Sequence, residues 1–275
     1  MPARAGVVGH TDGGGVAQGA VLAGAVVEAD VVLVRALPVS SGPDLFSPLP
    51  ISHVLKYYSP FDLLSHPRYH RLKVKELEEL YHRIAICPDC DLCRTRTHTV
   101  PGEGPPNAEV MFVGEAPGFY EDQQARPFVG PAGRFLDELI ASAGLRRDQV
   151  YITNVIKCRP PDNRDPLPAE TEACRKHLQR QIELIRPRLV VTLGRYSLAW
   201  FFPRDSIGKV HGQPRLRDGI SFLPMYHPAA ALHAGNMRKV IEEDFHKIPE
   251  ALEKARRAQQ TASALQPEPE QMRLF

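Results

Sequence analysis

The stretch EVMFVG at residues 109–114 decides the fold, because it is a short and nearly continuous apolar run. Three further runs share its character: VYITN at 150–154, RLVVTLG at 188–194 and SFLPMYH at 221–227. Runs of this kind, rich in valine, isoleucine and aromatic residues, are typical of strands covered on both faces. We therefore expect four buried strands.

Helical patterns separate the first three strands and follow the last. Residues 131–143 place apolar side chains on one face, and residues 168–185 begin with a proline, which is harmless in a first turn. A helix over 195–202 follows the third strand, and a helix over 236–257 closes the unit. This alternation predicts a parallel sheet with helices on both faces.

The remainder of the chain lacks such patterns. Residues 1–75 contain a glycine run at 13–15 and a proline-rich stretch at 38–60, so we expect a poorly ordered leader with one short strand at 31–35. Residues 76–254 hold the sheet and form the expected globular domain. Residues 255–275 are expected to be a flexible, polar tail.

Composition sets loose limits on function. The formal net charge of +2 over 275 residues is too small to indicate nucleic-acid binding by itself. The most apolar stretch, at 16–37, is interrupted by Glu28, Asp30 and Arg35 and lacks a basic start, so we expect neither a membrane span nor a signal peptide. A cytoplasmic location follows, with cysteines as thiols or ligands and not as disulfides.

Four of the five cysteines follow the spacing of a metal or cluster site: Cys87-x2-Cys90, then Cys158 and Cys174. Cys93 extends the first pair to C-x2-C-x2-C, so a Cys90/Cys93 pair is conceivable. Four thiolates also suit zinc, and spacing does not separate zinc from an iron–sulfur cluster.

Polar residues follow the expected strands at their carboxyl ends, where sheets of this class bind ligands. Glu115, Asn154 and His227 bring a carboxylate, an amide and an imidazole to one rim. A carboxylate can activate water, an amide can read a base edge, and a histidine can donate to an oxyanion. Each alone also suits a cap, loop or turn, but together they predict a hydrolytic site. Phe128, in a loop flanked by proline and glycine, offers a stacking face.

Four motifs resemble, in this order, those of the family 4 uracil-DNA glycosylases: GEAPG (114–118), RPFVGPAG (126–133), VYITNVIKCRPP (150–161) and MYHPA (225–229). The resemblance covers about residues 80–250. It implies a three-layer α/β/α sandwich around a four-stranded parallel sheet and a 4Fe-4S cluster. It also implies hydrolysis of the N-glycosidic bond of flipped-out uracil in DNA, the first step of base excision repair.

The resemblance further implies a role for each site residue. Glu115 would act on water or on the oxocarbenium-like sugar, and His227 would stabilise the leaving uracil anion. Phe128 would stack on uracil, and Asn154 would bind its edge. Glu121 matches a position that crowds the methyl group of thymine.

Two further positions are compared with the family pattern. Ala116, also assigned to substrate binding, replaces a glycine found in some relatives. The cysteine pattern of the family matches Cys87, Cys90, Leu92 and Arg96, so the implied cluster ligands exclude Cys93 and are Cys87, Cys90, Cys158 and Cys174. The cluster would hold the loop beside Asn154 in place and take no part in the chemistry.

Two other classes of function compete with a glycosylase. One is a uracil-DNA binding protein of the same fold without turnover, such as a related group that traps DNA through a histidine in an inserted loop. Residues 157–164 lack that insertion and its histidine, which favours turnover. The other is a metal-stapled nucleotide-binding module outside repair, which would not need the three polar residues together.

DNA contacts are expected around the same rim, from Arg159, Arg164 and residues 229–239. Leu232 is the expected wedge into the minor groove, with a buried residue at a helix start as the alternative. The last five residues, Gln271–Phe275, resemble the peptide by which bacterial repair proteins bind the replication sliding clamp. We expect a monomer.

Overall fold

The computed structural model describes residues 67–264 of the chain. The strand expected at 31–35 and the clamp-binding peptide at 271–275 lie outside the described residues. Helix α3 (Pro67–Ala85) begins ahead of the domain boundary expected at residue 75, and helix α11 (Ile248–Ala264) continues past residue 254. None of the described helices is long and apolar enough to cross a membrane.

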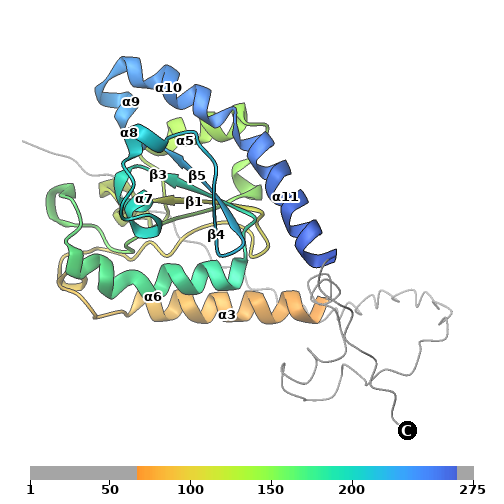
Figure 1. Ribbon diagram of the computed structural model, residues 1–275. Helices are drawn as coiled ribbons and strands as arrows, with labels where there is room; N and C mark the ends of the chain where they lie inside the picture. The colour runs from red at the N-terminus through yellow and green to blue at the C-terminus, as the bar shows by residue number, and fades with distance from the viewer. Residues whose placement is uncertain (1–66, 265–275) are drawn as a thin grey trace, which may run out of the picture. The chain divides into compact units, whose positions relative to one another are not determined.

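A five-stranded mixed sheet forms the centre of the domain (Figure 1). Its strands are β1 (Val110–Gly114), β2 (Tyr151–Asn154), β3 (Leu189–Leu193), β4 (Arg215–Arg217) and β5 (Ile220–Met225), in the order β2-β1-β3-β5-β4. The four expected strands are present and pair in parallel, which confirms the α/β class. The prediction of an exclusively parallel, four-stranded sheet is wrong, because β4 adds an antiparallel edge.

The additional strand arises from a tight hairpin. Asp218 and Gly219 both adopt positive φ, 50° and 75°, and reverse the chain between β4 and β5. Two-residue turns of this composition match the twist of the flanking strands and strongly favour hairpins. The Asp-Gly pair in the sequence was the signal for β4.

Helices cover both faces of the sheet. The expected helices are observed as α5 (Pro131–Ser142), α6 (Pro168–Ile185) and α7 (Arg195–Phe201). The single helix expected over 236–257 is instead two, α10 (Gly235–Phe245) and α11, which are separated by residues 246 and 247. Pro249 explains this break, because it lacks the N–H donor that would bond the carbonyl of Phe245 and its ring clashes with that carbonyl.

Two hydrophobic clusters separate the three layers. Phe112, Ile152 and Val191 point to the side packed by α5, α10 and α11. The neighbouring strand residues Met111 and Tyr151 point to the other side, which is packed by α3, α6 and α7. This alternation follows from the two-residue period of a strand. The parallel strands therefore end at one common edge.

Short elements connect the strands and long helices of this framework. Helix α4 (Phe119–Gln124) follows β1, and helix α9 (Ala230–His233) follows β5. Helix α8 (Ile207–Val210) precedes the β4–β5 hairpin. Three short 3-10 helices, η1 (Asp91–Arg94), η2 (Arg147–Gln149) and η3 (Pro161–Asn163), complete the described elements.

Candidate active site and cysteine centre

Asn154 ends β2 with its side chain buried and partly unpaired. It is 1% exposed, and its Oδ1 has no hydrogen-bond partner among the described residues. Gly114, its strand neighbour, leaves the room for it: a Cβ there would lie 2.4 Å from this oxygen and 2.6 Å from Cζ of Phe128. A buried, unpaired carbonyl oxygen is costly. Its position beside an aromatic ring is suited to a ligand that brings an N–H donor.

Phe128 occupies a strained position over this pocket. Its φ is 52°, a left-handed conformation that is uncommon for residues other than glycine. Gly133 permits this loop, since a Cβ there would lie 2.0 Å from the Phe128 carbonyl oxygen. The Phe128 ring stacks near His227, with ring centroids 5.5 Å apart at 27°. Strain of this kind is typical of functional sites.

Two side chains hold the Phe128 loop in place. Glu121 Oε1 accepts the backbone N–H groups of the two residues after Phe128, at 2.9 and 2.8 Å. Arg147 donates to the carbonyl oxygens of Pro127 and Phe128, at 2.6 and 3.3 Å. Glu121 was expected to face the thymine methyl position, and the structure also gives it this loop-holding contact.

His227 follows β5 and is oriented by its own turn. Its Nδ1 accepts the backbone N–H of Ala229 at 3.1 Å, so Nε2 carries the ring proton and is the donor. Burial lowers the pKa of His227 to about 4, with Glu121 opposing this effect. The ring is therefore neutral at physiological pH. Gly194 lies close by, and a Cβ there would be 3.1 Å from the His227 Cβ.

Glu115 follows β1 in a partly buried position. Burial, with a smaller contribution from the Asp165 carboxylate, raises the pKa of Glu115 to about 7, while Arg195 opposes both effects. Asp165 and Arg195 form an ion pair of 2.7 Å. A carboxyl group with such a pKa can act as a base at physiological pH. The sequence pattern did not identify this supporting pair.

The other residues expected to contact substrate or DNA differ in how exposed they are and in whether they already have partners. Ala116 is partly buried and packs against the α3/α6 cluster. Leu232, in α9, is 51% exposed, so the alternative of a buried residue at a helix start is wrong. Arg159 lies over the Phe119 ring at 5.2 Å. Arg164 instead binds both oxygens of buried Glu170, so the structure does not leave it free for DNA.

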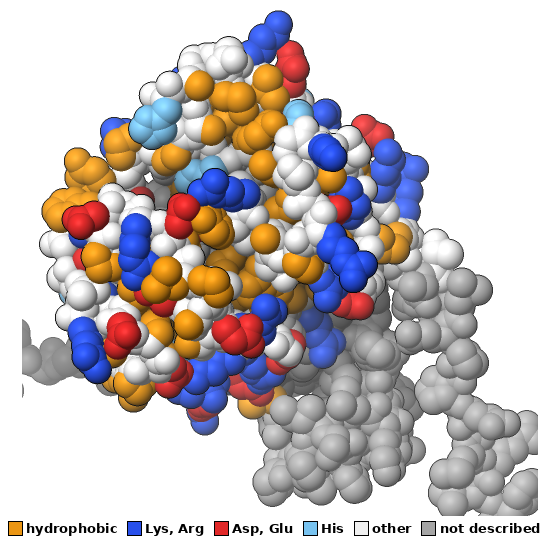
Figure 2. Space-filling view, turned by 60° about the vertical axis from the view of Figure 1, so that its left-hand side comes forward, with side chains coloured by type: hydrophobic (Ala, Val, Ile, Leu, Met, Phe, Trp, Pro, Cys, Tyr) orange, Lys and Arg blue, Asp and Glu red, His pale blue; other side chains and the backbone are white. Residues whose placement is uncertain are grey.

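The strand ends face the viewer in Figure 2, where hydrophobic side chains line a recessed centre and charged side chains lie around it. Glu115, Asn154 and His227 come from three of the strand ends at this edge. The structure therefore places the expected polar residues at one rim, as their positions after parallel strands predict.

The cysteines form a second centre. Cys87, Cys90, Cys158 and Cys174 line one small cavity, whereas Cys93, which is also described, does not. All are free thiols. Burial raises the pKa of each of the four, that of Cys174 to about 12, so thiolates there require a compensating positive charge. The donor set therefore suits a metal centre.

Nitrogen groups aim at the sulfurs of this centre. Arg96 Nη1 donates to the Cys158 Sγ at 3.0 Å, and the Lys157 backbone N–H donates to the Cys174 Sγ at 3.3 Å. Hydrogen bonds to sulfur are typical supports of cluster ligands. Arg96 matched the family pattern in the sequence, whereas the backbone contact carried no sequence signal.

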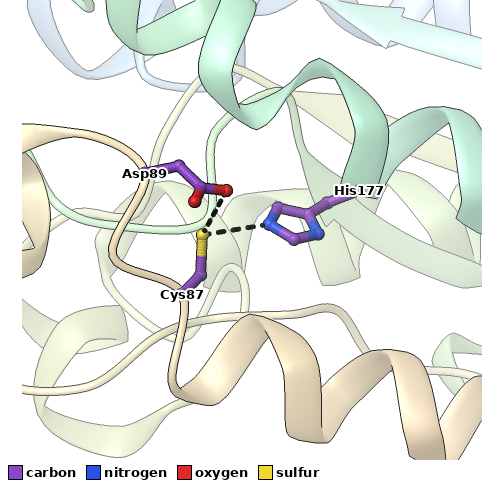
Figure 3. A group of neighbouring side chains, drawn as sticks. All are labelled: Cys87, Asp89 and His177. Carbon is purple, nitrogen blue, oxygen red and sulfur yellow. Dashed lines mark hydrogen bonds between the residues drawn. The ribbon is translucent and has the colours of Figure 1, made fainter.

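A mixed set of ligand atoms surrounds Cys87 (Figure 3). Its Sγ lies 3.2 Å from Oδ2 of Asp89 and 3.3 Å from Nε2 of His177, and the three ligand atoms lie within 4.8 Å of one another. Sulfur, oxygen and nitrogen donors also suit zinc. His177 lies one helical turn after Cys174 on α6, a spacing that could have identified it.

Lys157 connects the two centres, and the sequence interpretation missed it. Its side chain is 1% exposed, and Nζ donates to Thr153 Oγ1, the Asn154 carbonyl oxygen and Gln181 Oε1 at 2.7, 2.6 and 2.7 Å. Burial lowers its pKa to about 7, while the nearby Cys174 and Cys158 oppose this shift. A lysine inside the apolar run NVIKC was the available signal.

The sequence of the chain is similar to those of known proteins. The sequence model of the uracil DNA glycosylase superfamily matches residues 101–253. Type-4 uracil-DNA glycosylase of Sulfurisphaera tokodaii is 50% identical over 184 residues, which is 63% of this chain and 84% of that protein. Its counterpart in Archaeoglobus fulgidus is 46% identical over 64% of this chain and 94% of that protein. Type-5 uracil-DNA glycosylase of Thermus thermophilus is 37% identical over 114 residues, which is 36% of this chain and 52% of that protein. The chain belongs to the uracil DNA glycosylase superfamily and, within it, to the type-4 uracil-DNA glycosylases.

Proposed function

We propose that this protein is a hydrolase that removes uracil from DNA by cleaving the N-glycosidic bond and leaves an abasic site. The names of its type-4 relatives support this activity. The structural observation that carries it is the unpaired Asn154 Oδ1 beside the Phe128 ring. Together they offer an acceptor and a stacking face for one base.

Recognition would proceed on an extruded nucleotide, because the glycosidic bond is inaccessible within the base stack. Uracil N3–H would donate to Asn154 Oδ1, and the Asn154 amide would donate to uracil O4. Cytosine lacks the N3 proton and carries an amino group at C4, so its hydrogen-bonding edge is reversed. A buried mismatch of this kind discriminates strongly. Glu121 and Ala116 would shape the remaining pocket wall.

Hydrolysis would divide the developing charges between two side chains. As the bond between C1′ and N1 breaks, its electron pair leaves with uracil, and His227 Nε2–H donates to a carbonyl oxygen of the departing anion. Ionised Glu115 faces the positive charge that develops on the sugar and takes a proton from the attacking water. The water oxygen bonds to C1′. Neutral His227 suits this role as a hydrogen-bond donor.

We assign Cys87, Cys90, Cys158 and Cys174 to a 4Fe-4S cluster. Their common cavity, the donors aimed at Cys158 and Cys174, and the type-4 relationship support the assignment. When bound, the cluster would join the loop after α3, the segment after β2 and helix α6. Iron and sulfide analysis tests this: about four of each per chain is expected, and stoichiometric zinc without iron would contradict it. Cys93→Ser is the control that should retain the iron.

Uracil release from an oligonucleotide with a single uracil tests the activity itself. Wild type should release free uracil, and Asn154→Ala and His227→Ala should release far less. Asn107→Ala, at an exposed asparagine in the loop before β1, is the matched control and should behave as wild type. No release of uracil by wild type would contradict the proposed function.

We also propose a role for Leu232 in extrusion of the base. Exposed Leu232 would fill the space that the extruded uracil leaves in the DNA.

The C-terminal peptide is proposed to bind a partner protein. Gln271–Phe275 would dock on the sliding clamp, so deletion of these five residues should abolish clamp affinity while uracil release stays unchanged. Unchanged clamp affinity would contradict the docking. A monomeric state and a cytoplasmic location stay predictions from the sequence.

A further inference from the structure

Two large aromatic side chains lie exposed side by side at the beginning of α4. Phe119 is 50% exposed and Tyr120 is 52% exposed, directly after the GEAPG segment that follows β1. Their rings meet edge to face, with centroids 5.6 Å apart. Exposed aromatic pairs of this size are unusual on a protein surface unless they bind a partner. The mechanism proposed above uses neither ring.

Contacts place this pair between two segments of the proposed uracil pocket, the loop that carries Phe128 and the segment after Asn154. A Cβ on Gly130 would lie 3.1 Å from Cδ2 of Tyr120, so Tyr120 packs against the loop that carries Phe128. On the other side, Arg159 from the segment after Asn154 lies over the Phe119 ring at 5.2 Å. The aromatic pair therefore adjoins the position at which DNA must leave the pocket.

The positive charge of Arg159, above the Phe119 ring, is not neutralised by a neighbouring carboxylate among the described residues. Its Nε donates to the amide oxygen of Asn163 at 2.7 Å, and within residues 67–264 no carboxylate lies within ion-pair distance of its guanidinium. Arg126 and Arg195, in contrast, pair with Glu103 and Asp165. Arg159 can therefore contact a phosphate while the ring below it contacts a base.

We propose that Phe119, Tyr120 and Arg159 form a binding site for an unpaired base, with its phosphate, next to the excised uracil in single-stranded DNA. The inference rests on the proposed function and deepens it. Aromatic faces stack on any base, and a guanidinium binds the backbone, so the site would tolerate sequence. In a duplex the neighbouring bases stay stacked on one another, and the rings contribute less. The site would therefore contribute more to binding of uracil in single strands than in duplexes.

Kinetics on two substrates test this site. Uracil release is measured from a single-stranded oligonucleotide and from the same strand paired with guanine opposite uracil, for wild type, Phe119→Ala, Tyr120→Ala and the double variant. Loss of one ring should raise KM about tenfold on the single strand, more in the double variant, and leave kcat unchanged. On the duplex, KM should change by less than about twofold. Tyr120→Phe keeps the ring and should behave as wild type.

Leu216→Ala is the matched control, because Leu216 is a 68% exposed hydrophobic residue on β4, paired with the first half of β5 at the other end of the sheet. Equal KM changes on both substrates, or none on the single strand, would overturn the inference. Failure of wild type to release uracil from either substrate would instead overturn the proposed function. Thermal melting of each variant identifies loss of fold, and quenching of 2-aminopurine placed beside an abasic site then reports stacking independently of turnover.

Discussion

The uracil pocket and the cysteine centre adjoin each other but are built in opposite ways. In the pocket, Asn154 Oδ1 is unpaired and Phe128 is strained, so stabilisation is left to a ligand that enters from outside. In the cysteine centre, Arg96 and Lys157 already donate to sulfur. The difference indicates that the pocket serves recognition of the base and the cysteine centre supports the structure, although both regions share the segment after β2.

The largest effect should follow damage to the scaffold. Cys158→Ser removes a buried thiol that we propose as a cluster ligand and would weaken a centre that joins three segments, so folding and DNA binding should be lost together. Circular dichroism and DNA-binding titration measure both properties, and Cys93→Ser is the control. Loss of turnover with fold and DNA binding intact would contradict the division between the two regions.

Damage to the pocket should abolish activity while the fold survives. Gly114→Ala would place a Cβ 2.4 Å from Asn154 Oδ1, which forces the amide or the Phe128 ring to move. We expect kcat/KM for uracil release to fall about 100-fold, because misplacement by about an ångström has effects of this size. Gly208→Ala, where a Cβ would make only an ordinary contact of 3.6 Å with Tyr226 Oη, is the matched control. Full activity of Gly114→Ala would show that base binding does not need this space.

A substitution at Lys157 tests whether this side chain connects the uracil pocket with the cysteine centre. Lys157→Met removes three buried hydrogen bonds and leaves the Asn154 carbonyl oxygen without this donor. The free energy of unfolding should fall by about 1–3 kcal/mol, with a moderate loss of activity. Denaturant titration measures the first effect, and Lys209→Met, at an exposed lysine, is the control. An unchanged free energy of unfolding would show that Lys157 does not connect the two regions.

The smallest effect concerns the protonation of Glu115. Its ionised form is the base, and its pKa is raised to about 7, so activity should rise with pH through about 7. Asp165→Asn removes a charge that raises this pKa and should move the acid limb to lower pH, whereas Arg195→Gln should move it to higher pH. Asp148→Asn, at an exposed position, should leave the profile unchanged. Shifts in the opposite directions would exclude Glu115 as the titrating base.

The sequence predicted what depends on local patterns. The apolar runs predicted β1, β2, β3 and β5, and parallel strand ends predicted that Glu115, Asn154 and His227 share a rim. The break before α11 and the hairpin at Asp218–Gly219 were missed, although Pro249 and the Asp-Gly pair signal them locally. Lys157 and His177 had weaker local signals, a lysine inside an apolar run and a spacing of one helical turn from Cys174. Their roles depend on contacts between residues of different elements, which those signals do not specify.

The central claim is that Asn154 Oδ1 reads the N3–H of uracil. The most direct measurement compares release of uracil and cytosine from matched single-base oligonucleotides by wild type and by Asn154→Asp. The carboxylate keeps the size of the side chain but removes its donor, so it loses its partner for uracil O4 and gains one for the cytosine amino group. We predict that the ratio of uracil to cytosine release falls by at least about 100-fold. An unchanged ratio in a folded variant would contradict the account.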